Sequence, residues 1–233
     1  GMERIPDGFV DMILCDLPYG TTACKWDTII PFEPLWEQYK RIIKSNGCIA
    51  LFGKEPFSSY LRLSNLGMYK YDIIYKKTRP SNVFNAKKMF MNWHENISIF
   101  YDKLPCFNPQ MTSGIPYKKK LNKQNRDNSI YGKTGEKQDY IKVSNGERYP
   151  TTILEFSNDN HNSLHPTQKP VELCEYLIKT YTNENDLVLD NCMGVATSAI
   201  ACMNTKRNYI GFETDNTYFN LGNERIKDTI THN

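Results

Sequence analysis

The sequence contains no hydrophobic run near the roughly 20 residues that a transmembrane helix needs, and its first residues lack the charged and apolar segments of a secretory signal. It has only four histidines, none spaced as a pair of metal ligands, and its seven cysteines include no C-x-x-C pair. These absences predict a cytoplasmic protein with reduced thiols, without a membrane segment, a disulfide framework or a metal site.

The chain has 233 residues, enough for one substantial hydrophobic core and too few for several independent domains. Its net charge of +3 is too small to indicate a nucleic-acid partner by itself. The charge is unevenly distributed, however, because residues 103–150 hold ten cations and only four acids. Across residues 103–160 aliphatic residues are sparse, and aromatic residues are interleaved with the cations. This composition is typical of an inserted nucleic-acid-binding lobe, and a solvated linker is the alternative.

A short apolar run over residues 10–15 predicts a strand that is buried on both faces. It ends at Asp16, which is followed by Leu17, Pro18 and Tyr19. In an open parallel sheet the ligand crevice lies at the carboxyl ends of the strands, so these residues would project into it. A carboxylate and a peptide carbonyl can accept both hydrogens of an exocyclic amine, and the Tyr19 ring offers a face for a planar base. The alternative is a plain turn, in which Asp16 caps a helix and Pro18 fixes φ.

The hydrophobic periodicity predicts alternating helices and strands along the rest of the chain. Helices are expected over residues 31–44, 56–65, 171–181, 198–204 and 216–230. Strands are expected over residues 48–53, 69–77, 95–101, 187–190 and 208–213. This alternation predicts an α/β protein with a mostly parallel sheet.

The C-terminal part has the pattern of a βαβ unit. A strand ends in Asp190, a loop with Gly194 leads to a helix, and the next strand ends in Glu213, about 20 residues further on. Gly194 allows a ligand to approach the backbone closely, and Glu213 can accept from both hydroxyls of a ribose. The loop lacks the G-x-G-x-x-G spacing and the lysine of a P-loop, so it fits a nucleoside without phosphates better. An ordinary βαβ unit with surface acids is the alternative.

These motifs follow one another in a specific order. The corner at residues 16–19 precedes the basic region, then come His165-Pro166-Thr167-Gln168-Lys169-Pro170 and the segments 189–194 and 211–215. In this order and spacing the chain resembles the permuted β-class DNA amino-methyltransferases over essentially its entire length. It looks especially like the solitary adenine methylases of phages and prophages. The element over residues 165–170 matches the family's H-P-T-Q-K-P almost verbatim and is the most specific signal.

The resemblance implies a Rossmann-like, S-adenosylmethionine-dependent methyltransferase fold with a mostly parallel twisted sheet, helices on both faces and a circularly permuted motif order. It divides the chain into a catalytic half over residues 2–102, an inserted basic target-recognition region over 103–160 and a cofactor-binding half over 161–233. The family usually starts with one more strand, so we expect the sheet to lack an N-terminal edge strand. Double-stranded DNA in a bacterial or phage-infected cell is the implied partner, and a homodimer is left open.

The resemblance also assigns roles to individual residues. Asp16, Pro18 and Tyr19 occupy the catalytic D-P-P-Y position. The residues implied in binding S-adenosylmethionine are Asp190, Cys192, Gly194, Thr197, Glu213, His165, Thr167 and Lys169. The expected nucleic-acid contacts are Arg79, Asn82, Lys87 and Lys88, together with Lys118, Lys119, Lys120, Lys123 and Arg126 of the basic region. The alternative for the first four of these is an ordinary solvated loop.

Four positions depart from the family pattern. Leu17 replaces the first proline of the corner, and Cys192 replaces an aromatic residue of the cofactor loop. Val195-Ala196 replaces Ser-Gly in the same loop. If position 196 needs a positive φ or a close backbone approach, the Cβ of Ala196 costs on the order of 1 kcal/mol and weakens cofactor binding.

We therefore expect methyl transfer to N6 of an adenine extruded from duplex DNA, without a covalent enzyme intermediate. Aspartate at position 16 favours adenine through the resemblance, whereas the chemistry of the corner also permits N4 of cytosine. A related corner that methylates RNA or protein amides is a further alternative, although neither an asparagine at position 16 nor an RNA-binding appendage is present. A degenerate methylase that only binds DNA is the alternative outside enzymes.

Overall fold

The computed structural model describes residues 1–22, 24, 27–121, 140–158 and 168–232. The chain divides into two compact units. The main unit contains residues 1–108 and 151–233, and the small unit contains residues 109–150. The expected target-recognition region, 103–160, is therefore wider at both ends than the separate unit.

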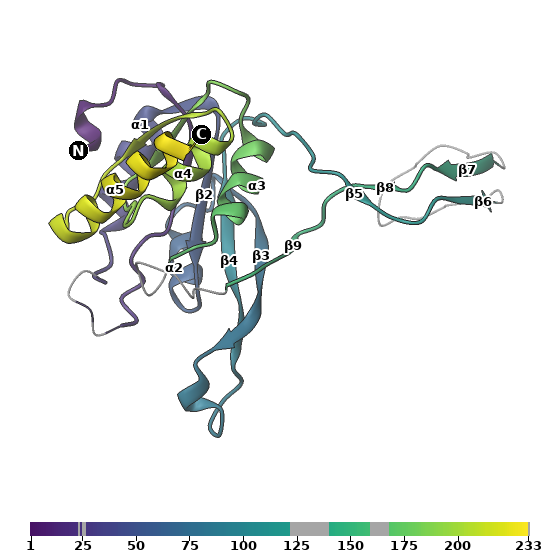
Figure 1. The fold of residues 1–233 in the computed structure, drawn as a ribbon, viewed down its shortest axis with the longest axis horizontal. Helices are drawn as coiled ribbons and strands as arrows, with labels where there is room; N and C mark the ends of the chain where they lie inside the picture. Colours follow the sequence, from purple (N-terminus) through teal and green to yellow (C-terminus); the bar gives the residue numbers. More distant parts are fainter. Residues whose placement is uncertain (23, 25–26, 122–139, 159–167, 233) are drawn as a thin grey trace. The chain divides into compact units, whose positions relative to one another are not determined.

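A seven-stranded sheet forms the centre of the main unit, in the order β11-β10-β1-β2-β4-β3-β9 (Figure 1). The neighbours β11, β10, β1 and β2 are parallel, whereas β4 is antiparallel to both β2 and β3. The strands are β1 (Val10–Cys15), β2 (Ile43–Gly53), β3 (Tyr69–Ser81), β4 (Asn92–Phe100), β9 (Ile153–Phe156), β10 (Leu187–Asp190) and β11 (Asn208–Gly211).

Both faces of the sheet are covered by helices because the central strands are apolar on both sides. Along β1, Met12 and Leu14 pack in one core cluster with Leu177 of α3, whereas Ile13 packs in the other with Trp36 of α1. Each fully buried aliphatic side chain of this kind contributes roughly 1.5–3 kcal/mol. The helices are α1 (Phe32–Ile42), α2 (Phe57–Ser64), α3 (Val171–Tyr181), α4 (Thr197–Asn204) and α5 (Asn216–His232), with short 3-10 turns η1 (Met2–Arg4) and η2 (Val83–Asn85). This is the expected Rossmann-like α/β fold with helices on both faces.

Several element boundaries differ from the expectation, and one strand was not expected. The first helix ends at Ile42, and β2 begins at Ile43 because Ile43 pairs with Val10 of β1. Strand β3 continues to Ser81, four residues beyond the predicted end. Residues 153–156 form β9, which pairs with β3 in the main sheet, although they were assigned to the insertion. This pairing joins residues about 80 apart in the chain, so a local sequence pattern does not predict it.

Strand β11 forms one edge of the sheet, and no strand within the described ranges pairs with its outer side. The expected lack of an N-terminal edge strand stays a prediction. No helix within the described residues is long and apolar enough to cross a membrane.

The small unit consists of short antiparallel ladders. Strand β5 (Thr112–Ser113) pairs with β8 (Glu147–Arg148), and β6 (Tyr117–Leu121) pairs with β7 (Tyr140–Ser144). The run Lys118–Lys120 lies in β6 and is exposed to solvent. The described part of the basic region is therefore built as strands.

Candidate active site

A cavity of about 630 Å³ lies in the main unit, at the carboxyl ends of the parallel strands. Its lining includes Asp16 after β1, Asp190 at the end of β10 and Glu213 after β11. Residues of the predicted catalytic corner and of the predicted cofactor loop thus line the same cavity, as the sheet topology predicts.

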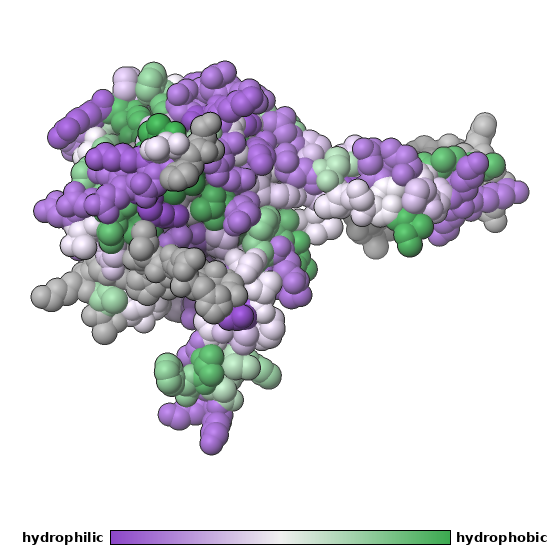
Figure 2. Space-filling view, in the orientation of Figure 1, coloured by the Kyte–Doolittle hydropathy of each residue, from purple (hydrophilic) through white to green (hydrophobic). Residues whose placement is uncertain are grey.

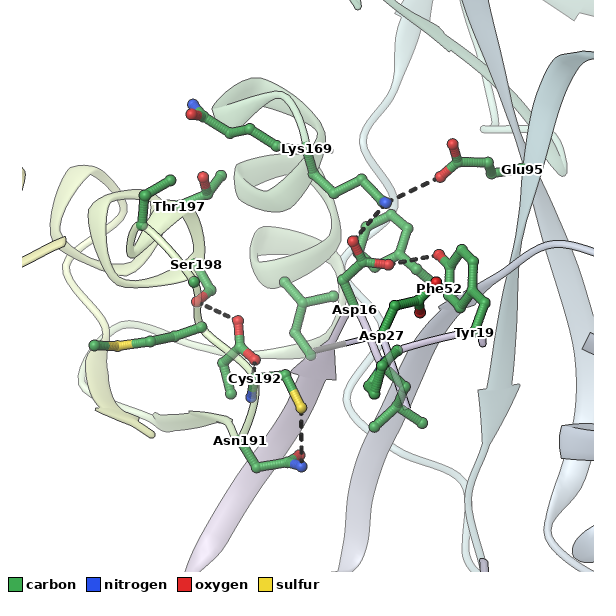
Figure 3. Close-up of a pocket in the computed structure, with 18 of the residues that line it drawn as sticks. Asp16, Tyr19, Asp27, Phe52, Glu95, Lys169, Asn191, Cys192, Thr197 and Ser198 are labelled. Carbon is green, nitrogen blue, oxygen red and sulfur yellow. Dashed lines mark hydrogen bonds and ion pairs between the residues drawn. The ribbon is translucent and has the colours of Figure 1, made fainter. Parts of the chain in front are cut away.

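The first side of the cavity is the corner that follows β1. The Tyr19 hydroxyl donates to Asp16 Oδ1 over 2.5 Å (Figure 3). The Tyr19 ring lies 5.1 Å from the Phe57 ring, tilted by 30°. Pro18 lacks an N–H and restricts Leu17 to extended conformations, which ends the strand and turns Asp16 into the cavity.

Asp27 fixes the loop behind this corner. Its carboxylate accepts the backbone N–H groups of Gly20, Thr21 and Thr22 over 2.7–2.9 Å. Three such bonds to one charged acceptor order a polar segment that has no secondary structure. Asp27 was not predicted as a site residue, because an acid in a polar loop gives no signal of its own.

Asp16 is the first of four side chains of alternating charge that contact one another in a row. Lys169 Nζ lies 2.6 Å from Asp16 Oδ2 and 3.1 Å from Glu95 Oε2 (Figure 3). Lys77 pairs with the other Glu95 oxygen. The Lys169 and Glu95 side chains are only 10% and 12% exposed, so these charges are poorly screened by water. Lys169 was predicted from the resemblance to bind the cofactor, and the structure places it against the Asp16 carboxylate.

Glu95 reaches this row of charges because β4 is antiparallel to β2. Asn96 of β4 pairs with Gly53 at the carboxyl end of β2, so the amino end of β4 lies at the cavity. The sequence predicts the strand but not its direction, and Glu95 was therefore missed. Tyr75 and Gln168 also line the cavity, and each has a buried oxygen that lacks a hydrogen-bond partner within the described ranges.

The charges shift the ionisation of the carboxyl groups. Burial raises the pKa of Asp16, the Lys169 cation lowers it and the Glu95 carboxylate raises it again, with a net increase. Burial also raises the pKa of Glu95, but the cations of Lys169 and Lys77 outweigh burial and hold that pKa at about 2. Lys169 thus opposes the effect of burial and favours the carboxylate form of Asp16, which only accepts hydrogen bonds.

The second side of the cavity is the loop between β10 and α4. Asp190 accepts the Cys192 N–H over 3.0 Å and the Ser198 hydroxyl over 2.6 Å. Burial raises the pKa of Asp190 to about 6, although these hydrogen bonds oppose the shift. Asn191 accepts the Tyr39 hydroxyl over 2.5 Å, which ties the loop to α1.

Glu213 faces the same loop. It accepts the N–H groups of Gly194, Thr214 and Asp215, each over 2.8 Å. A carboxylate has about four acceptor positions, so a ribose can add one hydrogen bond directly. A second bond from the ribose requires the Gly194 N–H to move away.

Ala196 has a φ of +64°, so the conformation that favours glycine is present at this position. Its Cβ does not line the cavity. It is fully buried in a cluster with Met193, Ala199 and Ile226, on the side of α5. A Cβ built on Gly222 of α5 would lie 3.2 Å from the Ala196 Cβ. The substitution therefore acts through backbone conformation and packing, whereas its effect on cofactor binding remains a prediction.

The remaining predicted residues are distributed over three regions. Cys192, Gly194 and Thr197 line the cavity. Arg79, Asn82, Lys87 and Lys88 lie at the far end of β3 and in the turn after it, and Lys118, Lys119 and Lys120 lie in the small unit. His165, Thr167, Lys123 and Arg126 lie outside the described residues. Within the described ranges, no group of three or more histidine, cysteine, aspartate or glutamate side chains could hold a metal ion.

A mainly parallel α/β sheet with a nucleoside-sized cavity at its strand ends defines a protein of the nucleotide-cofactor-binding class. The family model N6_N4_Mtase, described as DNA methylase, matches residues 10–224. The chain therefore belongs to the N6-adenine/N4-cytosine DNA methyltransferase family.

Curated relatives include two type II methyltransferases. The chain is 26% identical over 255 residues to M.HinfI of Haemophilus influenzae, which covers 97% of this chain and 66% of that protein. It is also 26% identical over 243 residues to M.HpaI of Haemophilus parainfluenzae, covering 97% of this chain and 70% of that protein. The chain thus spans about two thirds of the length of these relatives.

Two solved structures illustrate the likeness in fold. The M1.HpyAVI–SAM complex has a TM-score of 0.61 and 25% sequence identity, covering 96% of this chain and 90% of that chain. The cytosine-N4-specific PvuII DNA methyltransferase has a TM-score of 0.65 and 14% identity, covering 98% and 86%. The second likeness shows the fold alone.

Proposed function

We propose that this protein transfers a methyl group from S-adenosylmethionine to the exocyclic N6 amine of adenine in duplex DNA. The observation that carries the proposal is that Asp16 and Tyr19 line the same cavity as Asp190 and Glu213. A planar base and a nucleoside cofactor can meet there, because each side of the cavity offers the groups that one of them requires.

Asp16 and the Pro18 carbonyl hold the amine that becomes methylated. Both groups only accept hydrogen bonds, so together they bind the two amine hydrogens and direct the nitrogen lone pair into the cavity. The Tyr19 ring supports the base by stacking. The Lys169 cation maintains Asp16 as an acceptor while the target base, extruded from the duplex, is bound. Most of the rate gain then comes from positioning.

The opposite side of the cavity fits S-adenosylmethionine, which supplies an electrophilic methyl group on a positively charged sulfur. The cavity volume of about 630 Å³ is within the range of cofactor sites. Glu213 has an acceptor position available for the ribose, and Asp190 holds the loop that contains Gly194. Cys192 and Thr197 line the same side.

DNA would contact two regions outside the cavity. Arg79, Asn82, Lys87 and Lys88 lie at and beyond the end of β3, whose residues Lys77 and Ser81 line the cavity. The lysines at 118–120 give the small unit a cationic strand for phosphate contacts. Sequence recognition through the small unit is part of the same proposal.

The decisive experiment incubates the purified protein with tritiated S-adenosylmethionine and bacterial DNA. We expect label in the DNA, and we expect Asp16→Asn to lower kcat/KM by roughly 100-fold or more, because the amide replaces one acceptor by a donor. Asp7→Asn is the matched control, since Asp7 is a carboxylate with a 79% exposed side chain. A wild-type protein that binds this DNA and transfers no label would support the DNA-binding alternative instead.

The labelled base identifies the substrate. After digestion of the DNA to nucleosides, mass spectrometry should detect N6-methyladenine. N4-methylcytosine in its place would replace the adenine assignment by the cytosine alternative, because the corner can hold either amine.

A further inference from the structure

The tip of the β3–β4 hairpin, residues 82–91, exposes large apolar side chains. The Phe84 and Phe90 side chains are 104% and 96% exposed, and Val83 and Met89 are exposed beside them. Figure 2 shows a group of hydrophobic residues near the end of the hairpin, with hydrophilic residues at its extremity, and the hairpin projects from the body of the main unit. Single exposed apolar residues are ordinary, whereas a cluster at the end of a projecting hairpin indicates a partner.

Hydrogen bonds fix the backbone of this tip. Asn82 adopts the left-handed conformation, with a φ of +67°, and accepts from Asn85 Nδ2 over 2.6 Å. The Lys88 N–H donates to the Asn85 carbonyl over 2.8 Å. The two phenylalanine rings are therefore presented outward by an ordered turn, instead of collapsing on each other.

The charge around the rings selects the partner. Residues 78–94 include Arg79, Lys87 and Lys88 and contain no carboxylate. An apolar tip with cations and no acid is complementary to duplex DNA. The phosphates of DNA attract the cations, and its stacked bases offer apolar surfaces to the rings. A second copy of this chain offers no such complementarity, because its own tip is also cationic.

The stem places the tip beside the candidate active site. Lys77 and Ser81 of β3 line the cavity, and the tip begins at the next residue, Asn82. Asn158 holds the stem, because it accepts the Arg79 N–H over 2.9 Å and donates to the Arg79 carbonyl over 3.0 Å. A ring on this tip is thus attached to the strand that borders the pocket for the extruded base.

We propose that Phe84 and Phe90 form an apolar wedge that enters the base stack of duplex DNA next to the target base. This inference rests on the proposed function. The wedge separates neighbouring bases, while Lys87 and Lys88 contact the adjacent phosphates. Separation of the stack lowers the cost of extruding the target base into the cavity.

The test uses duplexes recovered from a random-sequence pool by binding to the purified protein, with 2-aminopurine at each adenine in turn. Wild-type protein should increase the fluorescence at one position, and Phe84→Ala/Phe90→Ala should abolish the increase. On the duplex of the same sequence with adenine at that position, because 2-aminopurine has no N6 amine to methylate, the double variant should methylate about 10-fold more slowly. With the target base opposite an abasic site, it should methylate within about 3-fold of the wild type, because no base pair remains to be broken and extrusion costs less.

Lys87→Ala/Lys88→Ala is the matched control on the same tip. It should weaken binding to both duplexes equally and make the slope of log K against log[salt] less negative by about 2, whereas the phenylalanine variant should leave the slope unchanged.

Equal loss of methylation by the phenylalanine variant on both duplexes would overturn the wedge. An altered oligomeric state of that variant, with normal fluorescence, would instead make the tip an interface between copies. Because the fluorescence requires no methyl transfer, an inactive wild type that still unstacks the base would contradict only the proposed function.

Discussion

At the scale of single residues, two side chains of opposite charge control the ionisation of Asp16. Lys169 contacts its carboxylate over 2.6 Å, and Glu95 lies on the other side of Lys169. The pKa of Asp16 is raised by burial, lowered by Lys169 and raised by Glu95. Since only the carboxylate form accepts both available hydrogen bonds, activity should disappear as the pH falls through the pKa of Asp16.

This balance predicts opposite effects of two substitutions on the acidic limb of the profile of kcat/KM against pH. Lys169→Gln removes the cation, raises the pKa of Asp16 and should move the limb to higher pH. Glu95→Gln removes the carboxylate, lowers the pKa of Asp16 and should move the limb to lower pH. Tritium transfer measured across pH for the two variants and the wild type checks the signs.

A purely structural role of these residues would give a different result. Both variants would then lose activity at every pH, and the acidic limb of their kcat/KM profiles would lie at the same pH as in the wild type. The two residues would also fail the test if both limbs moved in the same direction, because the charges act on Asp16 with opposite signs.

At the scale of elements, the loop after β10 and helix α5 are fitted to each other. Ala196 is held at a φ of +64°, and its Cβ faces the gap left by Gly222. A Cβ on Gly222 would lie 3.2 Å from the Ala196 Cβ and 3.3 Å from the Gly194 carbonyl oxygen. The glycine in the helix thus makes room for the side chain in the loop.

Gly222→Ala should therefore destabilise the protein by about 1 kcal/mol, although alanine is the better helix former by a similar amount. In a chain that also carries Ala196→Gly, the tightest contact is removed, and the same substitution should be neutral or stabilising. Denaturant unfolding of the wild type, both single variants and the double variant measures the coupling, expected at about 0.5 kcal/mol or more. Additive effects would show that the loop and the helix do not constrain each other.

At the scale of the whole molecule, positive charge is concentrated in one segment of the chain. Residues 103–150 hold ten cations and four acids in a chain whose net charge is only +3. The lysines at 118–120 lie in β6, where they are exposed. Exposed lysines contribute to DNA affinity mainly by releasing counterions from phosphates.

Substituting Lys118, Lys119 and Lys120 together by glutamine should therefore weaken DNA binding at low salt and make the slope of log K against log[salt] less negative by about 2 to 3. The control replaces three exposed lysines of the main unit, Lys40, Lys70 and Lys227, and removes the same net charge. Fluorescence anisotropy over a salt series measures both slopes. Identical slopes for the two triple variants would assign the effect to net charge instead of to this strand.

The predictions from the sequence agree with the structure where a feature depends on neighbouring residues, and they fail where it depends on pairing with another segment. Strand β1 and the corner after it are local, because Val10–Cys15 is apolar on both faces and Pro18 ends it. The end of β3 was placed four residues too early, because Thr78 to Ser81 are polar and become a strand only by pairing with another segment, as Ser81 does with Asn92. Strand β9 was missed for the same reason, since four residues with no helix beside them carry little periodicity.

The sequence by itself determined the fold class, the corner with Asp16 and Tyr19, the loop with Gly194 and the separation of charge along the chain. Each is encoded by residues within about 20 positions of one another, through periodicity, turn chemistry and composition. Only the tertiary structure decided that Lys169 lies between Asp16 and Glu95, that the Ala196 side chain packs against α5, and that Phe84 and Phe90 are exposed at the end of a strand bordering the cavity. The physical reason is that packing between segments far apart in the chain sets strand direction and strand pairing. A local sequence pattern does not predict which distant segments come together.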